Sequence, residues 1–247
     1  MKLRDLFNEE ELFCEQRLMI LVDTGQVKRR RDGRVDLNVE MPVRVPWIYV
    51  KKRQASCSLY NESYREYFDF IPQFCMHSCW KTVVKPSKVA DLFRLYHIMR
   101  ALDIPSKCGL ETRVLQGGFR GFFYADNLEI AQMHYNEVKP VLDEELKYPY
   151  EIFIKRACTE MEDDFGPSDT WQVQPGWPER EKYLDRIIVF PVDLDGDQAD
   201  WHKRFIMREW IRRTCKTDDT YKEIVDADLV VPTVCYQEVE DGQGESS

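Results

Sequence analysis

The feature that most constrains the fold is the order of apolar segments between residues 80 and 162. Four short runs, at 80–85, 108–115, 119–125 and 150–162, have the length and composition of β-strands. Two longer segments with apolar residues spaced three and four apart predict helices after the first and the third strand. The predicted order is therefore strand, helix, strand, strand, helix, strand. Right-handed crossovers then place the third strand between the first and the second, antiparallel to both.

This pattern predicts an α+β protein with a ferredoxin-like core, the split βαβ arrangement. Ser87 is expected to cap the first of the two crossover helices. Upstream, Asn8 and Glu11 form a capping-box pattern that starts an N-terminal helix, and Gly25 ends it. Asp32-Gly33 gives a hairpin turn signal after that helix. We therefore expect a helix and a hairpin to pack on the core from its N-terminal side.

The C-terminal third changes in character, because Pro, Gly and Trp become frequent over 163–181. This stretch is interpreted as a loop that leads to a strand at 186–194 and a helix at 201–215. The predicted sections are 1–65 (N-terminal helix and β-hairpin), 66–162 (ferredoxin-like core), 163–236 (loop with a strand-helix extension packed on the core) and 237–247 (disordered acidic tail).

The composition narrows the class of protein. The chain has 247 residues, of which 43% are hydrophobic, and no run approaches the ~18 apolar residues of a membrane span. The N-terminal segment is charged and has no apolar stretch typical of an export signal, so we expect a cytoplasmic location and no membrane partner. A formal net charge of −9 disfavours a general nucleic-acid coating protein but allows a local basic face.

Four of the eight cysteines are predicted to meet at one end of the sheet. Cys75 and Cys79 precede the first strand, Cys108 opens the second and Cys158 falls in the second half of the fourth. The expected strand order brings these three places to the same rim. His77 lies between the first two cysteines and could replace one of the four thiols.

Four thiolates at one place are typical of a structural zinc site, and a C-x₃-C pair is a common source of two ligands. A [4Fe–4S] cluster takes the same four ligands. The alternative is that these cysteines pack in the interior as small apolar residues. Zinc is the favoured interpretation.

The segment from Arg120 to Tyr124, with the sequence RGFFY, resembles the third-strand signature of RNA-recognition motifs. The resemblance implies that Phe122 and Tyr124 stand on the open face of the sheet and stack on bases, next to Arg120. The match is partial, because Phe123 occupies a position that is small in the signature, its later positions differ, and the first strand has no matching aromatic residue. Packing of both rings under the terminal extensions is the alternative.

Two basic strips point to a phosphate-bearing or acidic partner. Residues 28–34 read KRRRDGR, and Arg204, Arg208 and Arg212 recur at every fourth position of the last predicted helix. The alternative for such strips is a solvated surface.

Asp193, Asp195 and Asp197 form a D-x-D-G-D string after an apolar run. Carboxylates at this spacing could hold Mg²⁺ for phosphoryl or nucleotidyl transfer. The string resembles the metal-binding loop of multisubunit RNA polymerases and the first motif of haloacid-dehalogenase-type phosphatases, although too little chain follows it for either. A polar turn before the last helix is the favoured alternative.

Together these patterns predict a non-enzymatic accessory protein that binds a protein or nucleic-acid partner and carries a structural zinc site. A Mg²⁺-dependent transfer enzyme and an iron–sulfur redox protein are the two alternative functions. The sequence does not indicate a small-molecule substrate.

Overall fold

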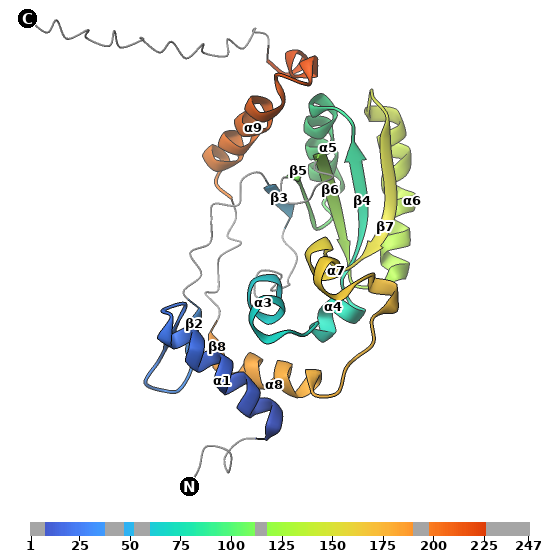
Figure 1. Ribbon diagram of the computed structural model, residues 1–247. Coiled ribbons are helices and arrows are strands. Elements are labelled where there is room, and N and C mark those ends of the chain that lie inside the picture. Colours follow the sequence, from blue (N-terminus) through green and yellow to red (C-terminus); the bar gives the residue numbers. More distant parts are fainter. Residues whose placement is uncertain (1–7, 38–46, 52–59, 112–117, 190–197, 226–247) are drawn as a thin grey trace, which may run out of the picture.

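The computed structural model describes residues 8–37, 47–51, 60–111, 118–189 and 198–225. Over these ranges the protein is a mixed α+β structure with one five-stranded sheet and one three-stranded sheet (Figure 1). The α+β class predicted from the sequence is confirmed.

The five-stranded sheet is antiparallel throughout. Its last four strands follow one another in the order expected from right-handed crossovers. The edge strand β3, which lies next to β5, was not predicted and makes the sheet one strand wider. In spatial order the strands are β3 (Trp47–Lys51), β5 (Ser106–Glu111), β6 (Gly118–Ala125), β4 (Trp80–Pro86) and β7 (Tyr150–Arg156).

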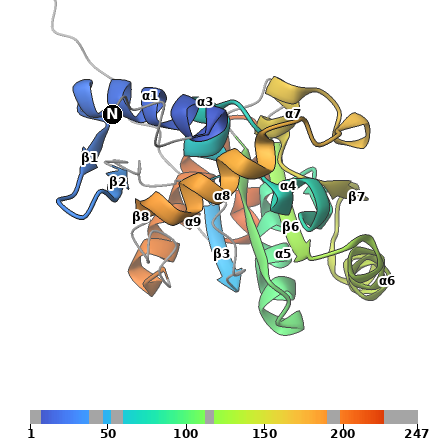
Figure 2. The ribbon, with the colours of Figure 1, turned by 90° about the horizontal axis from the view of Figure 1, so that it is seen from below.

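Two helices, α5 (Val89–Leu102) and α6 (Leu128–Glu145), cover one face of this sheet, and Figure 2 shows them on the same side of the strands. The buried residues of the sheet and of both helices form the main hydrophobic core. The C-terminal helix α9 (Asp200–Thr214) joins this core, where the rings of Phe93 and Trp210 meet edge to face with centroids 5.5 Å apart. Helix α9 therefore packs on the main core.

The N-terminal elements form a second core. Helix α1 (Glu9–Asp23) begins with the predicted capping box of Asn8 and Glu11, and the predicted hairpin joins two short strands. Helix α8 packs against α1, and β8 pairs in parallel with β2. The bounds of these elements are β1 (Val27–Arg29), β2 (Val35–Leu37), α8 (Trp177–Ile187) and β8 (Ile188–Val189).

Two expectations for the segments around the core were wrong. The fourth core strand ends at Arg156 rather than 162, so Cys158 is the N-cap of a helix and not a strand residue. The stretch 163–181 was expected to be a loop but contains a 3₁₀ turn and the start of α8.

The remaining elements are η2 (Tyr60–Arg65), α3 (Glu66–Phe68), α4 (Gln73–His77), α7 (Thr159–Phe165), η3 (Ser168–Thr170) and η4 (Asp219–Glu223). Within the described ranges no helix combines the length and apolarity needed to cross a membrane.

The start of α5 is capped from far along the chain, and not by Ser87 as predicted. The backbone N–H of Val89 donates to Asp218 Oδ2 at 2.7 Å, and that of Ala90 donates to Thr220 Oγ1 at 3.3 Å. Asp218 and Thr220 are both buried. These bonds satisfy two N–H groups that an α-helix leaves without a partner in its first turn, and they attach the C-terminal segment to the core.

We expect Asp218→Ala to lower the free energy of unfolding by about 1–2 kcal/mol, because the Val89 N–H loses its capping carboxylate and Thr220 loses the two hydrogen bonds that it donates to Asp218 Oδ1. Urea unfolding followed by circular dichroism measures the change. Asp219→Ala is the matched control, since this neighbouring side chain is exposed. Equal losses in the two variants would show that the cap contributes nothing.

A second prediction concerns Glu223. Hydrogen bonds from Tyr148, Lys147 and Arg94 lower the pKa of this carboxyl from 4.5 to about 2. A lowered pKa stabilises the fold above pH 4.5, and this contribution is lost as the pH falls towards 2. We therefore expect Glu223→Gln to reduce stability at pH 7 and to approach the wild type as the pH falls through that window. Urea unfolding over a pH series, with Asp219→Asn as control, tests this, and a difference that does not change with pH would contradict it.

Candidate functional site

Strand β6 presents different side chains on its two faces. Phe119, Gly121, Phe123 and Ala125 are buried on the side of α5 and α6, whereas the residues between them are half-buried on the other side. The alternation arises because successive strand residues point to opposite faces. The three residues of the RNA-recognition-like signature, Arg120, Phe122 and Tyr124, therefore share the face that α5 and α6 leave uncovered.

Strand β3 adds two aromatic residues to the same face. Tyr49 is paired with Lys107 of β5, and Lys107 is paired with Phe122 of β6, so the three residues form one row across the sheet. The rings of Trp47 and Phe122 lie 5.5 Å apart, and the rings of Phe122 and Tyr124 stack at 6.5 Å with an angle of 27° between their planes. Trp47 and Tyr49 were not predicted as site residues, although the alternation in WIYVK is a strand signal.

Lys107 lies at the centre of these rings. Its Nζ is 4.7 Å from the ring centroid of Trp47, 5.4 Å from that of Phe122 and 5.6 Å from that of Tyr49. Each distance is within the range in which a ring attracts a cation. The ammonium group is thus held among aromatic rings on the sheet surface. We call the set Trp47, Tyr49, Lys107, Phe122 and Tyr124 the aromatic face.

The free edge of β3 is closed by one side chain from the C-terminal segment. Gln198 Oε1 accepts from Tyr49 N at 3.0 Å, and Gln198 Nε2 donates to Trp47 O at 2.9 Å. The amide thus pairs with the strand as a neighbouring strand would. This arrangement fixes the backbone that carries Trp47 and Tyr49, and it places the start of α9 beside the aromatic face.

Further cations adjoin the aromatic face. Lys81 Nζ lies 5.3 Å from the ring centroid of Phe122. At the far end of β6, Arg120 lines a cavity of about 480 Å³ together with Lys85 and Glu151. Burial lowers the pKa of the Arg120 guanidinium, and the carboxylates of Glu111 and Glu151 oppose this effect. The face therefore combines aromatic rings with positive charge that is partly balanced at one end.

The two predicted basic strips differ in the structure. Arg204, Arg208 and Arg212 are all exposed on α9, and within the described residues Arg212 pairs with Glu209 at 2.8 Å. Trp201 and Phe205 are exposed on the same helix. In the hairpin, by contrast, two arginines are engaged within the protein: Arg29 pairs with Glu15 at 2.7 Å and Arg30 pairs with Asp36 at 2.6 Å. The helix is the better candidate surface for an acidic partner.

The predicted four-thiol site is only partly brought together. Cys75 and Cys158 pack in one small cluster with Met76 and Met161, and the Cys79 thiol hydrogen-bonds to Cys158. Cys108 does not join them and is buried in the main core. Across the described ranges, no three His, Cys, Asp or Glu side chains are grouped so that they could hold a metal ion.

The register of the sheet explains why Cys108 lies elsewhere. Cys108 is paired with Gly121, and Gly121 is paired with Val84, which is five residues along the chain from Cys79. Five strand residues span about 16 Å, whereas two thiolates on one zinc ion are within about 5 Å of each other. Cys108 is instead buried in the main core. The thiols therefore do not fit a shared zinc ion or [4Fe–4S] cluster, and binding of either stays a sequence-based prediction.

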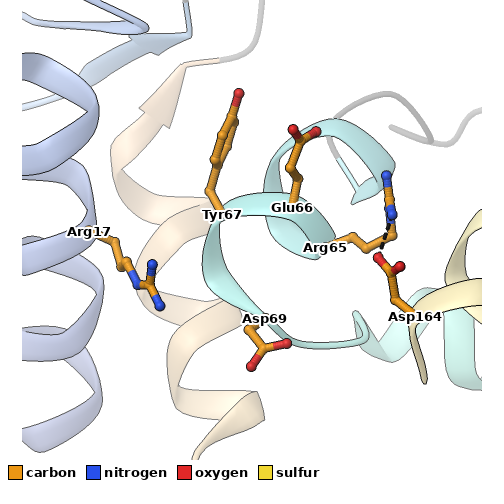
Figure 3. Close-up of a pocket in the computed structure, with 6 residues that line it drawn as sticks. All are labelled: Arg17, Arg65, Glu66, Tyr67, Asp69 and Asp164. Atoms are coloured by element: carbon orange, nitrogen blue, oxygen red, sulfur yellow. Dashed lines mark hydrogen bonds and ion pairs between the residues drawn. The ribbon is translucent and has the colours of Figure 1, made fainter. Parts of the chain in front are cut away.

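Two other candidate sites give weaker support for a function. Asp193, Asp195 and Asp197 lie outside the described residues, so magnesium binding there also stays a prediction. A cavity of about 490 Å³ lies between α1, α3 and α7 (Figure 3). Its lining combines Arg17 and Arg65 with acidic side chains, and Arg65 is paired with Asp164. These opposite charges neutralise one another and favour no ligand class.

Comparisons of the chain with protein-family models, with curated proteins and with solved structures found no match. The aromatic face is therefore interpreted from its own geometry.

Gly121 of the signature has a packing role. A Cβ atom added there would lie 2.5 Å from Leu95 Cδ2 and 2.7 Å from Met99 Cε of α5. We expect Gly121→Ala to lower the free energy of unfolding by about 1–3 kcal/mol, because the helix must move or repack. Urea unfolding measures the loss, and in Gly121→Ala/Leu95→Ala it should be smaller than the sum of the two single losses. Additive losses would contradict this account.

Proposed function

We propose that the protein is a non-enzymatic accessory protein that binds single-stranded nucleic acid across the aromatic face of a ferredoxin-like core. The order β5-β6-β4-β7 with two helices on one face supports the ferredoxin-like assignment. The observation that carries the function is the cation among the rings: Lys107 lies within 5.6 Å of the centroids of Trp47, Tyr49 and Phe122 on the face opposite α5 and α6.

The chemistry favours a single strand over a duplex. Unpaired bases offer flat faces that stack on aromatic rings, whereas a duplex keeps its bases stacked on one another. Phe122 and Tyr124 provide two rings whose planes lie 27° apart on neighbouring positions of one face. A lysine between such rings can meet the phosphate that links two stacked bases. A protein partner would use the rings without needing this cation, so nucleic acid is the better match.

A path for the strand leads from β6 across β5 and β3 to α9. Gln198 joins the edge of β3 to the start of α9, where Arg204 and Arg208 are exposed. The net charge of −9 disfavours general binding of phosphates, so we expect binding to use this path. Phosphate contacts from about three cations give a slope of about −2 for the logarithm of the binding constant against the logarithm of the salt concentration.

We expect Phe122→Ala to weaken binding of a labelled single-stranded RNA or DNA oligonucleotide about tenfold, because one base–ring stack contributes ~1–3 kcal/mol. Arg208→Ala should weaken binding less and reduce the salt slope by about 0.7, since it removes one phosphate contact from an exposed helix position. Fluorescence anisotropy over a salt series measures both changes.

Tyr135→Ala is the matched control, because this half-buried tyrosine lies on α6, behind the sheet. Thermal unfolding shows whether Phe122→Ala is folded. If that variant does not fold, Arg208→Ala still tests the proposed path of the strand. The proposal fails if neither oligonucleotide binds at low salt, if duplex binds more tightly than single strand, or if Tyr135→Ala is as harmful as Phe122→Ala. Binding of a protein in place of the oligonucleotides would assign the face to a protein partner.

A further inference from the structure

Two cysteines meet where β4 begins and β7 ends. The backbone N–H of Ala157 donates to Cys79 O at 2.7 Å, which extends the pairing of the two strands by one residue. Cys158 follows directly, and its thiol is hydrogen-bonded to the thiol of Cys79. The two side chains differ in access, since Cys79 is fully buried and Cys158 is half-buried. Cys158 is therefore the more exposed residue of the two.

A buried lysine completes this site. Lys81 Nζ lies 3.5 Å from Cys158 Sγ, and the residue Lys81 as a whole is only 5% exposed. The hydrogen bond from Cys79 and the charge of Lys81 both favour the thiolate, so the pKa of Cys158 is well below its usual value although burial opposes this. Glu160 also opposes it, and Lys107 contributes in the same direction as Lys81. A thiolate, and not a thiol, is the nucleophilic form of cysteine.

Two further cysteines, Cys14 and Cys108, lie in different surroundings. Burial raises the pKa of Cys14 to about 12 and also raises that of Cys108. Both are buried in the apolar cores. Cys14 and Cys108 therefore serve as internal controls.

We propose that Cys158 is a peroxide-reactive nucleophile and that Cys79 resolves the product as a disulfide. In the first step the Cys158 thiolate attacks one oxygen of a hydroperoxide, the O–O bond breaks, hydroxide or alkoxide leaves, and sulfur is oxidised to sulfenic acid. In the second step the Cys79 sulfur attacks the sulfenic sulfur, the S–O bond breaks, water leaves with the Cys79 proton, and the disulfide forms. Two thiol groups lose two electrons, and the peroxide is reduced.

The test uses the full-length reduced protein and hydrogen peroxide. Peptide mapping by mass spectrometry should find the Cys79–Cys158 linkage, which a thiol reductant reverses. In Cys79→Ser the reaction should stop at a Cys158 sulfenic acid, which the trapping reagent dimedone labels. In Cys158→Ser the residue Cys79 should stay reduced. Cys14→Ser and Cys108→Ser are the controls and should react as the wild type does.

Lys81→Met keeps both thiols and tests the charge without depending on the cysteine variants. It should slow alkylation of Cys158 by iodoacetamide at pH 7 about tenfold, because the thiolate loses its cation. The proposal is overturned if Cys75 or Cys215 oxidises as fast as Cys158, if Lys81→Met alkylates at the wild-type rate, or if elemental analysis finds zinc that is lost in Cys79→Ser and Cys158→Ser. These readouts follow thiol chemistry alone, so they do not depend on the outcome for the aromatic face.

Discussion

The close approach of α5 to β6 at Gly121 is the contact on which the arrangement depends. Without a side chain there, Leu95 and Met99 reach the strand backbone. This packing commits the odd-numbered residues of β6 to the interior, and the strand period then sends Phe122 and Tyr124 to the other face. The glycine of the signature is thus required by the core, and the exposure of the rings is a consequence of the same contact.

The segments that follow the core complete it through polar contacts over long sequence separations. Asp218 caps α5 from 129 residues away, and Gln198 pairs with the edge of β3 from 149 residues away. Each contact satisfies backbone groups that a helix start or a sheet edge leaves without partners. The segments on both sides of α9 are therefore attached to the five-stranded sheet and its helix α5 by these hydrogen bonds.

Local signals predicted much of this fold, and non-local contacts account for the rest. The capping box at Asn8, the turn at Asp32-Gly33 and the strand and helix periods between 80 and 156 are properties of neighbouring residues, and the structure contains them. Strand β3 is only five residues long, and partners distant in sequence hold it at the edge of the sheet. The grouping of thiols failed because it needed the register of Cys108 against Gly121, which strand order alone does not determine. The aromatic face was predicted only in part for the same reason. The sequence pattern indicated Phe122 and Tyr124 on β6 but not Trp47 and Lys107, which neighbouring strands bring beside them.

Lys81 connects the two sites. Its ammonium group is buried between the Phe122 ring, 5.3 Å away, and the Cys158 sulfur, 3.5 Å away. A buried cation costs free energy unless it is paired, and a thiolate is a stronger partner than an aromatic ring. The proposed oxidation of Cys158 removes an anionic group 3.5 Å from Lys81 and therefore changes the electrostatic surroundings of the Phe122 ring.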